Sequence, residues 1–254
     1  MCTIAILVGV ADLPVVIAAN RDELYTRDTR PPQVLAPGVV GGLDVLSGGT
    51  WLAVNREGRF AAVTNQRALS DPPTGVRSRG PVVKELAMAE DQDAYVGALD
   101  PRAYASMNLV WGDAQRVRIG YLRHDGSKDI VTLPPGVHVL CNDVLGSEEF
   151  PRGDRLRLAL DRMIASGARA WDEIVPPMKR ALMDHTREAD ERVPLSHLPL
   201  AIARELTANC IHTEYYGTRS ASLVGIEQGR VAAYLHADGP PCVTSFESKL
   251  ELLA

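Results

Sequence analysis

Strand-forming and helix-forming segments follow one another in blocks along this sequence, rather than alternating one by one. Apolar, β-rich runs bounded by turn residues fill most of residues 1–65, helical patterns follow, and more strands and then more helices precede a last set of strands. A parallel sheet would require strands and helices to alternate. The order therefore predicts an α+β fold in which two antiparallel sheets pack together with helices outside. No linker divides the chain, so we expect residues 1–254 to form a single domain.

Turn residues and periodicity locate the individual elements. The clearest hairpin joins strands at 50–55 and 60–65 through a loop that contains Gly58. Further strands are expected at 107–111, 117–122, 130–133, 137–141, 219–226, 231–236 and 243–247. Helices are expected from residue 81 and at 93–99, 154–165, 171–185 and 201–206. The proline-bearing segment 24–37 is expected to be a loop.

The first residues of the sequence place a nucleophile at the start of a strand. Apolar runs at 4–8 and 15–19 read as a hairpin, which brings Asn20 to Asp22 beside Cys2. A small second residue allows Met1 to be removed, and Cys2 would then carry a free α-amine beside its own thiol. A nucleophile with its own base is the arrangement of the N-terminal-nucleophile enzymes. The alternative is that Cys2 is a small, half-buried residue that opens an edge strand.

Composition argues against several classes of partner. The formal net charge of −5 and the aromatic content of 5% give no basic or base-stacking surface, so we expect no nucleic acid partner. No apolar run reaches the roughly 18 residues that span a bilayer, and no basic segment precedes the first apolar run. We therefore expect no integral membrane segment and a cytoplasmic location. The sequence does not indicate an oligomeric state.

The four cysteines are expected to be thiols in a reducing compartment. Cys2, Cys141, Cys210 and Cys242 lie far apart in the sequence and form no C-x-x-C pair. Cys210 and His212 share one side of an extended segment, but two groups make a poor zinc site. The sequence therefore predicts no metal site and no cofactor.

Several short motifs occur in a defined order. They are Met1-Cys2, Asn20-Arg21-Asp22-Glu23, the segments 48–52 and 58–65, and Tyr216-Gly217-Thr218-Arg219-Ser220. In this order the sequence resembles the NRDE family, also called the transport and Golgi organisation protein 2 family, from Met1 to about Leu235. The resemblance implies the αββα sandwich of N-terminal-nucleophile hydrolases, which is shared by choloylglycine hydrolases and penicillin V acylases.

The resemblance also implies roles for individual residues. Cys2 matches the nucleophile, Asp22 the aspartate that holds the α-ammonium, Asn142 the amide that faces the reacting carbonyl, and Arg219 the cation that lowers the pKa of the cysteine. These four side chains are expected to converge in one pocket. Alternatively, these residues have structural roles only: Asp22 and Asn142 would be turn residues, and Arg219 would lie on the surface.

Four further residues are candidates for substrate binding or support. Asn65 resembles a second asparagine of the site but also fits a strand-end turn, Asn20 lies beside the aspartate, and Arg21 and Glu23 are expected to form an ion pair at the strand end. Related hydrolases carry an arginine where this chain has Ala19. Arg21 is expected on the face opposite Asp22, which leaves the usual arginine–cysteine contact open.

Two functions of different classes follow. The first is a cysteine hydrolase or acyltransferase that acts on a carbon–nitrogen (non-peptide amide) bond or an acyl bond of a small molecule, such as an acyl amide or acyl thioester. The alternative is a non-catalytic carrier or trafficking protein for a hydrophobic ligand such as haem or acyl lipid.

Overall fold

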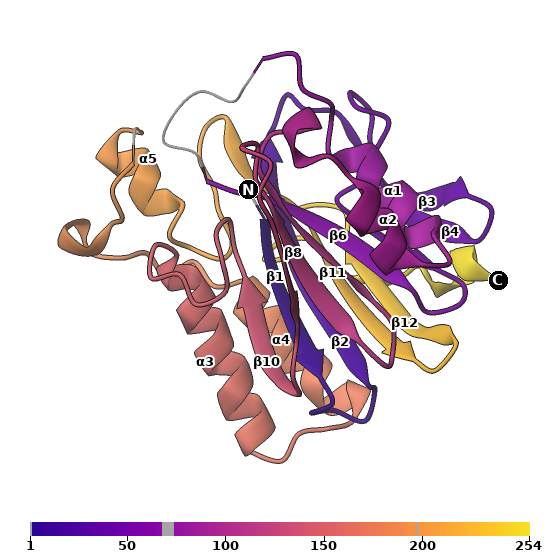
Figure 1. The fold of residues 1–254 in the computed structure, drawn as a ribbon. Coiled ribbons are helices and arrows are strands. Elements are labelled where there is room, and N and C mark those ends of the chain that lie inside the picture. Colours follow the sequence, from indigo (N-terminus) through magenta and orange to yellow (C-terminus); the bar gives the residue numbers. More distant parts are fainter. Residues whose placement is uncertain (1, 68–73, 197) are drawn as a thin grey trace.

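The computed structural model describes residues 2–67, 74–196 and 198–254, and it contains two antiparallel sheets (Figure 1). The first sheet has six strands in the order β10-β1-β2-β11-β12-β13, and the second has seven in the order β3-β4-β5-β6-β7-β8-β9. The strands are β1 (Cys2–Val8), β2 (Val15–Leu24), β3 (Thr29–Ala36), β4 (Val39–Asp44), β5 (Leu52–Asn55), β6 (Phe60–Asn65), β7 (Met107–Gly112), β8 (Val117–Leu122), β9 (Lys128–Thr132), β10 (Gly136–Leu140), β11 (Tyr216–Glu227), β12 (Arg230–Ala237) and β13 (Glu247–Ser248).

Five α-helices and three short 3₁₀ turns connect the strands of the described residues. The helices are α1 (Gly80–Met88), α2 (Gln92–Ala98), α3 (Pro151–Ala165), α4 (Trp171–Leu182) and α5 (Leu200–Glu205), and the 3₁₀ turns are η1 (Pro101–Ala103), η2 (Asp190–Arg192) and η3 (Leu250–Leu253). Helices α3 and α4 lie against the six-stranded sheet, and α1 and α2 lie against the seven-stranded sheet (Figure 1). Among the described residues, no helix combines the length and the apolar character needed to cross a membrane.

Three apolar cores separate these four layers. Ile4 and Ile6 of β1 pack between the two sheets with Phe60, whereas Ala5 and Leu7 of the same strand pack toward α3 and α4. A third core joins the seven-stranded sheet to α1 and α2. Strand β1 is thus covered on both faces, which explains its uninterrupted apolar sequence. The predicted α+β fold with an αββα arrangement is confirmed.

The register of β1 against β2 positions the polar residues at the strand ends. Cys2 pairs with Arg21, Thr3 with Asn20 and Ile4 with Ala19. Because directly opposed residues of an antiparallel pair lie on the same face, Cys2 and Arg21 face the space between the sheets, as Ile4 does. Side chains alternate along a strand, so Asp22 faces the helix layer.

Two segments differ from the sequence-based expectation. Residues 29–36 form β3 rather than a loop, and they hold Pro31 and Pro32 because β3 is an edge strand, where a missing N–H breaks no ladder. The strand expected at 243–247 is reduced to β13, because residues 241–244 form a turn.

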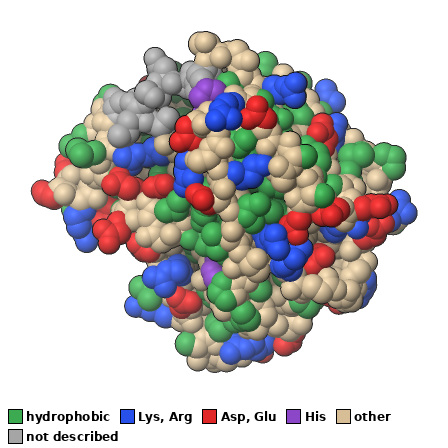
Figure 2. Space-filling model, in the orientation of Figure 1, with side chains coloured by type: hydrophobic (Ala, Val, Ile, Leu, Met, Phe, Trp, Pro, Cys, Tyr) green, Lys and Arg blue, Asp and Glu red, His purple; other side chains and the backbone are tan. Residues whose placement is uncertain are grey.

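Charged side chains of both signs lie next to each other on the face of the molecule shown in Figure 2. Many of them form surface ion pairs, such as Arg123 with Asp129 at 2.6 Å and Arg157 with Asp161 at 3.2 Å. Exposed pairs of this kind contribute about 0–1 kcal/mol each. The free energy of folding therefore comes mainly from the three buried cores.

Replacing Phe60 by alanine tests the core between the sheets. Phe60 is fully buried, so Phe60→Ala is expected to lower the free energy of unfolding by about 3–5 kcal/mol. Val34 on the edge strand β3 is 59% exposed, and Val34→Ala is the control, with an expected change of at most about 0.5 kcal/mol. Denaturant unfolding of both variants measures the difference, and equal losses would contradict the assigned packing.

Candidate active site

A cleft of about 490 Å³ opens where the ends of β1 and β2 meet the seven-stranded sheet. Cys2, Arg21 and Asp22 line it from the six-stranded sheet. Trp51 and Asn65 line it from the other side, and residues 76–80 add a loop wall. The cleft therefore lies between the two sheets at the edge where the first residues of the chain are found.

Cys2 is a half-buried thiol in this cleft. Burial raises the pKa of Cys2 above its ordinary value, and the carboxylate of Asp22 acts in the same direction. The guanidinium of Arg21 and a hydrogen bond from the backbone N–H of Asp22 lower the pKa of Cys2, but these effects are smaller. The thiol form is thus favoured, and the sulfur needs a base to become a nucleophile.

Asp22 is a fully buried carboxylate with two partners from distant parts of the chain. The hydroxyl of Thr218 donates to Oδ1 at 2.7 Å, and Nη1 of Arg152 lies 3.6 Å from Oδ2. Burial raises the pKa of Asp22, whereas Arg152 and Thr218 act in the opposite direction. These two residues therefore supply the charge and the hydrogen bond that an ionised Asp22 needs inside the protein.

Arg152 and Thr218 are residues of this site that sequence reasoning did not assign to it. Arg152 belongs to the first turn of α3, is fully buried, and donates from Nη2 to Oδ1 of Asn142 at 3.0 Å. The helix was expected to begin at Asp154, which would leave Arg152 in a preceding loop. Pro151, which suits the first helical position, is the signal that indicates the earlier start.

Close packing of α3 brings Arg152 to Asp22. A Cβ atom built on Gly153 would lie 3.0 Å from Sγ of Cys141, which is closer than Cβ atoms usually approach. The glycine therefore suits the close contact between α3 and the strand end that carries Cys141.

Asn142 is buried, and both ends of its amide are engaged. Its Nδ2 donates to the backbone carbonyl of Asn65 at 2.7 Å, and its Oδ1 accepts from Arg152. Asn142 is not among the described residues that line the cleft, whereas Asn65 is. Asn142 thus links Arg152 to the end of β6, and Asn65 is the asparagine beside Cys2 in the cleft.

Asn20 and Glu23 hold neighbouring segments. Nδ2 of Asn20 donates to the backbone carbonyls of Leu182 and Asn209 at 2.9 and 2.8 Å, which fixes the end of α4 to β2. Glu23 pairs with Arg27 at 3.8 Å instead of with Arg21. The expected Arg21–Glu23 ion pair is therefore replaced by a contact in which Arg21 stacks on Trp51, with 4.4 Å from its guanidinium carbon to the ring centre.

Arg219 is not brought to the cleft with the other predicted residues. A β-bulge between Thr218 and Ser220 interrupts the pairing of β11 with β2 at this position. Nη1 of Arg219 donates to the backbone carbonyls of Leu24 and Tyr25 at 3.0 and 2.8 Å. The expected convergence of Cys2, Asp22, Asn142 and Arg219 in one pocket is thus only partial.

Arg21 is the cation beside Cys2, because the two residues are cross-strand partners on one face. Its side chain is only 4% exposed, and its Nη1 has no hydrogen-bond partner among the residues that the structure describes. Arg79 also lines the cleft and donates to the backbone carbonyl of Ser106 at 3.1 Å. Among the described residues, four arginines and three carboxylates line the cleft: Arg21, Arg27, Arg77, Arg79, Asp22, Glu23 and Asp44. The lining therefore carries a formal excess of positive charge.

A second group of reactive side chains lies outside the cleft. The sequence indicated only Cys210 and His212 here, and two groups make a poor zinc site. The fold adds His185 and Cys242, and one ligand atom from each of the four residues lies within 4.8 Å of the others.

The architecture is that of N-terminal-nucleophile hydrolases. Penicillin V acylase from Agrobacterium tumefaciens superposes with a TM-score of 0.55 at 13% identity, over 99% of this chain and 88% of the acylase. A variant of conjugated bile acid hydrolase from Clostridium perfringens superposes with a TM-score of 0.57 at 11% identity, over 98% of this chain and 97% of the hydrolase. At such identities the likeness shows the fold, and the chain has the N-terminal-nucleophile hydrolase fold.

The sequence matches the Transport and Golgi organisation 2 family over residues 1–236, and the chain belongs to this family. The Transport and Golgi organization protein 2 homolog of Bos taurus is 26% identical over 228 residues, and that of Homo sapiens is 25% identical over 232 residues. Each alignment covers 84% of this chain and 82% of the relative. The resemblance deduced from the motifs is confirmed.

Replacing Arg152 tests the buried ion pair. Arg152→Met removes the buried guanidinium that lies 3.6 Å from Asp22, and this is expected to lower the free energy of unfolding by about 3–5 kcal/mol at neutral pH. Arg157 lies on the exposed side of the same helix, so Arg157→Met is the control, with an expected change of at most about 0.5 kcal/mol.

The loss is also expected to depend on pH. Without Arg152 the folded-state pKa of Asp22 rises further above its unfolded value of about 3.9, so the folded state binds a proton more tightly than the unfolded state. The free energy of unfolding of Arg152→Met should therefore fall furthest below that of the wild type at pH values above the Asp22 pKa of the folded variant. The difference should shrink as the pH falls through that pKa. Denaturant unfolding between pH 4 and 8 measures this. A deficit that does not change with pH would contradict the assigned pairing.

Proposed function

We propose that this protein is a cysteine hydrolase or acyltransferase that acts on a carbon–nitrogen (non-peptide amide) or acyl bond of a small molecule. Removal of Met1 exposes the α-amine of Cys2, which serves as the base for the thiol. The observation that carries this proposal is that Cys2 and Asp22 line one cleft, while Arg152 and Thr218 hold Asp22 from behind. The family match and the fold support it.

The reaction begins with proton transfer from the Cys2 thiol to its own α-amine. The thiolate attacks the acyl carbonyl carbon, and the leaving nitrogen or sulfur takes the proton back as the bond to it breaks. The acyl group is then bound to Cys2 as a thioester, which water or a second nucleophile releases. Asp22 stabilises the transient α-ammonium, because it is the buried carboxylate beside Cys2.

The oxyanion needs hydrogen-bond donors in the cleft. The amide of Asn142 already donates to the Asn65 carbonyl, whereas Asn65 and Arg21 both line the cleft. We assign Asn65 and Arg21 to this task. One donor of this kind contributes about 3 kcal/mol to lowering the barrier.

The lining of the cleft indicates the chemical class of the substrate. Its volume of about 490 Å³ falls in the range of about 300–1,000 Å³ that small-molecule sites occupy. The excess of arginines in this lining favours an acyl compound with a carboxylate or phosphate group near the reacting carbonyl.

The alternative function is a carrier for a hydrophobic ligand such as haem or acyl lipid. Leu46, Trp51, Val63 and Val76 give the cleft an apolar part, which supports this alternative. Such a carrier of acyl lipid would keep its ligand when the Cys2 thiol is removed, whereas the enzyme would lose turnover.

Removal of Met1 is a requirement of the proposed mechanism, because Cys2 has an α-amine only as the first residue. Protein purified from cells is expected to lack Met1 in its intact mass. The variant Cys2→Ala also has a small second residue, so it should lose Met1 as well. It therefore controls for the removal of Met1 in the absence of the thiol. Complete retention of Met1 in the wild type would contradict the mechanism.

Turnover distinguishes the enzyme from the carrier. With a panel of N-acyl amino acids and acyl thioesters, Cys2→Ala is expected to abolish turnover while the cleft still binds its ligands. Arg21→Gln should lower kcat/KM by about 10- to 100-fold, the value of one charge-assisted hydrogen bond. Arg219→Gln removes the same charge outside the cleft and is the matched control, with little expected change. Equal losses for the two arginine variants would contradict the assignment of Arg21.

A further inference from the structure

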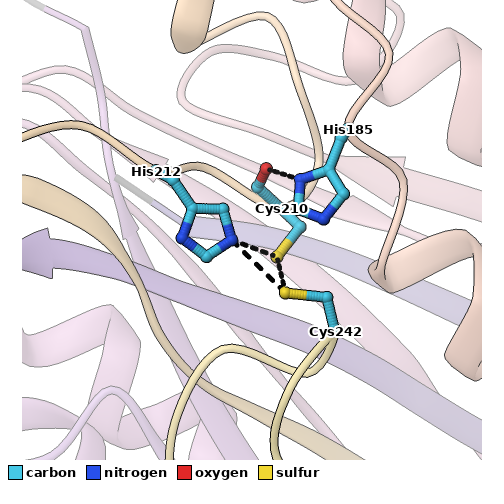
Figure 3. Close-up of side chains that lie close together, drawn as sticks. All are labelled: His185, Cys210, His212 and Cys242. Atoms are coloured by element: carbon cyan, nitrogen blue, oxygen red, sulfur yellow. Dashed lines mark hydrogen bonds between the residues drawn. The ribbon is translucent and has the colours of Figure 1, made fainter.

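Four potential metal ligands converge from three separate segments of the chain. His185 follows α4, Cys210 and His212 lie on the segment that leads into β11, and Cys242 lies in the turn after β12. Figure 3 shows the two sulfurs lying together with a ring nitrogen of His212 pointing at them, and His185 beside Cys210. Two thiols and two imidazoles form the ligand set of structural zinc sites.

The distances between the ligand atoms agree with a tetrahedral zinc ion. Zinc bonds of about 2.3 Å to sulfur and about 2.0 Å to nitrogen place two sulfurs about 3.8 Å apart, and a sulfur and a nitrogen about 3.5 Å apart. In the structure, Sγ of Cys210 lies 3.7 Å from Sγ of Cys242 and 3.6 Å from Nε2 of His212. Nε2 of His212 lies 3.3 Å from Sγ of Cys242. All three distances lie within about 0.2 Å of the tetrahedral values.

His185 completes the set with its Nε2 atom. Its Nδ1 makes a hydrogen bond of 3.0 Å with the backbone carbonyl of Cys210, so Nδ1 carries the proton and Nε2 is left as a ligand. A histidine that ligates a metal usually donates its other ring N–H to a carbonyl or carboxylate in this way. The rings of His185 and His212 lie 5.1 Å apart between centroids, which places both beside the two sulfurs.

Backbone contacts hold the ligands in position. The amide of Cys210 donates to the carbonyl of Asp184 at 2.9 Å, which ties the Cys210 segment to the residue before His185. His212 forms a β-bridge with Gly217, and the amide of Val243 closes the turn that carries Cys242. The ligand set is therefore largely preformed.

We infer that His185, Cys210, His212 and Cys242 bind one Zn²⁺ ion as a four-coordinate structural site. Two thiols lose their protons to solvent when the ion binds, and the two thiolates balance its charge. Four protein ligands leave no open position for a substrate, so the ion ties chain segments together and takes no part in the chemistry of the cleft. This inference does not rest on the proposed function.

The proposed zinc site lies next to Thr218, the residue that donates a hydrogen bond to Asp22. The residue between Cys210 and His212 is Ile211, whose amide donates to the hydroxyl of Thr218 at 2.9 Å. The same hydroxyl donates to Asp22. A metal ion that fixes residues 210–212 therefore also fixes the partner of the buried carboxylate.

Metal content and cobalt spectroscopy of the full chain test the inference. Protein purified without chelators is expected to contain about one zinc per chain by elemental mass spectrometry. After removal of the metal, titration with CoCl₂ should reach one equivalent and give the intense visible absorption of tetrahedral cobalt with thiolate ligands. Addition of ZnCl₂ should abolish this absorption and protect two thiols from a thiol reagent.

Variants locate the ion. Cys210→Ser combined with Cys242→Ser should lose the metal and the cobalt absorption, and His185→Ala should weaken zinc binding. Cys2→Ser and His138→Ala change a thiol and an imidazole outside the cluster, and both should keep the metal. The cobalt and thiol measurements on the wild type need no variant, so misfolding of the double variant leaves the test intact. A cobalt spectrum without thiolate coordination, a Cys210–Cys242 disulfide in unreduced protein, or metal kept by a folded double variant would overturn the inference.

Discussion

The register of β1 against β2 is the constraint on which the site depends. The pairing of Cys2 with Arg21 places the thiol and the guanidinium on the face between the sheets and leaves Asp22 on the helix side. A shift of one residue would exchange these faces, which would turn Cys2 toward α3 and put Ala5 where Ile4 and Ile6 now fill the core between the sheets. The same apolar packing that stabilises the hairpin therefore fixes the orientation of the candidate nucleophile.

Buried polar side chains behind Cys2 connect helix α3 to both sheets. Arg152 reaches Asp22 and Asn142 from α3, and Asn142 in turn reaches the end of β6 in the other sheet. Each of these groups is buried, so each needs its partner. The chain thus connects three of its four layers through one polar network behind Cys2.

Sequence reasoning predicted the architecture and the residues that strand ends bring together. The pattern of apolar runs indicated the two sheets, and the motifs indicated Cys2, Asp22 and Asn65, which all line the cleft. It could not place Arg219, because a β-bulge is a feature of pairing between strands and leaves no mark in the local pattern. The roles assigned to Cys2, Asp22 and Asn65 stay predictions.

The same limit explains Arg152 and the cysteine–histidine cluster. Arg152 acquires its role from the close packing of α3 on the sheet, where Gly153 lies against Cys141. His185 and Cys242 lie far from Cys210 in the sequence and are its neighbours only in the folded chain. Such contacts are set by tertiary packing, whereas periodicity and turn residues report local structure.

The central claim is that Cys2, with its own α-amine as base, is the reactive thiol of this protein. Treatment of the processed chain at pH 7 with a limiting amount of iodoacetamide, followed by peptide mass spectrometry, tests this claim most directly. The account predicts that Cys2 is alkylated well before Cys141, Cys210 and Cys242, and that a form of the chain that keeps Met1 loses this preference. Alkylation of Cys2 no faster than that of an ordinary exposed thiol, or equal rates with and without Met1, would contradict it.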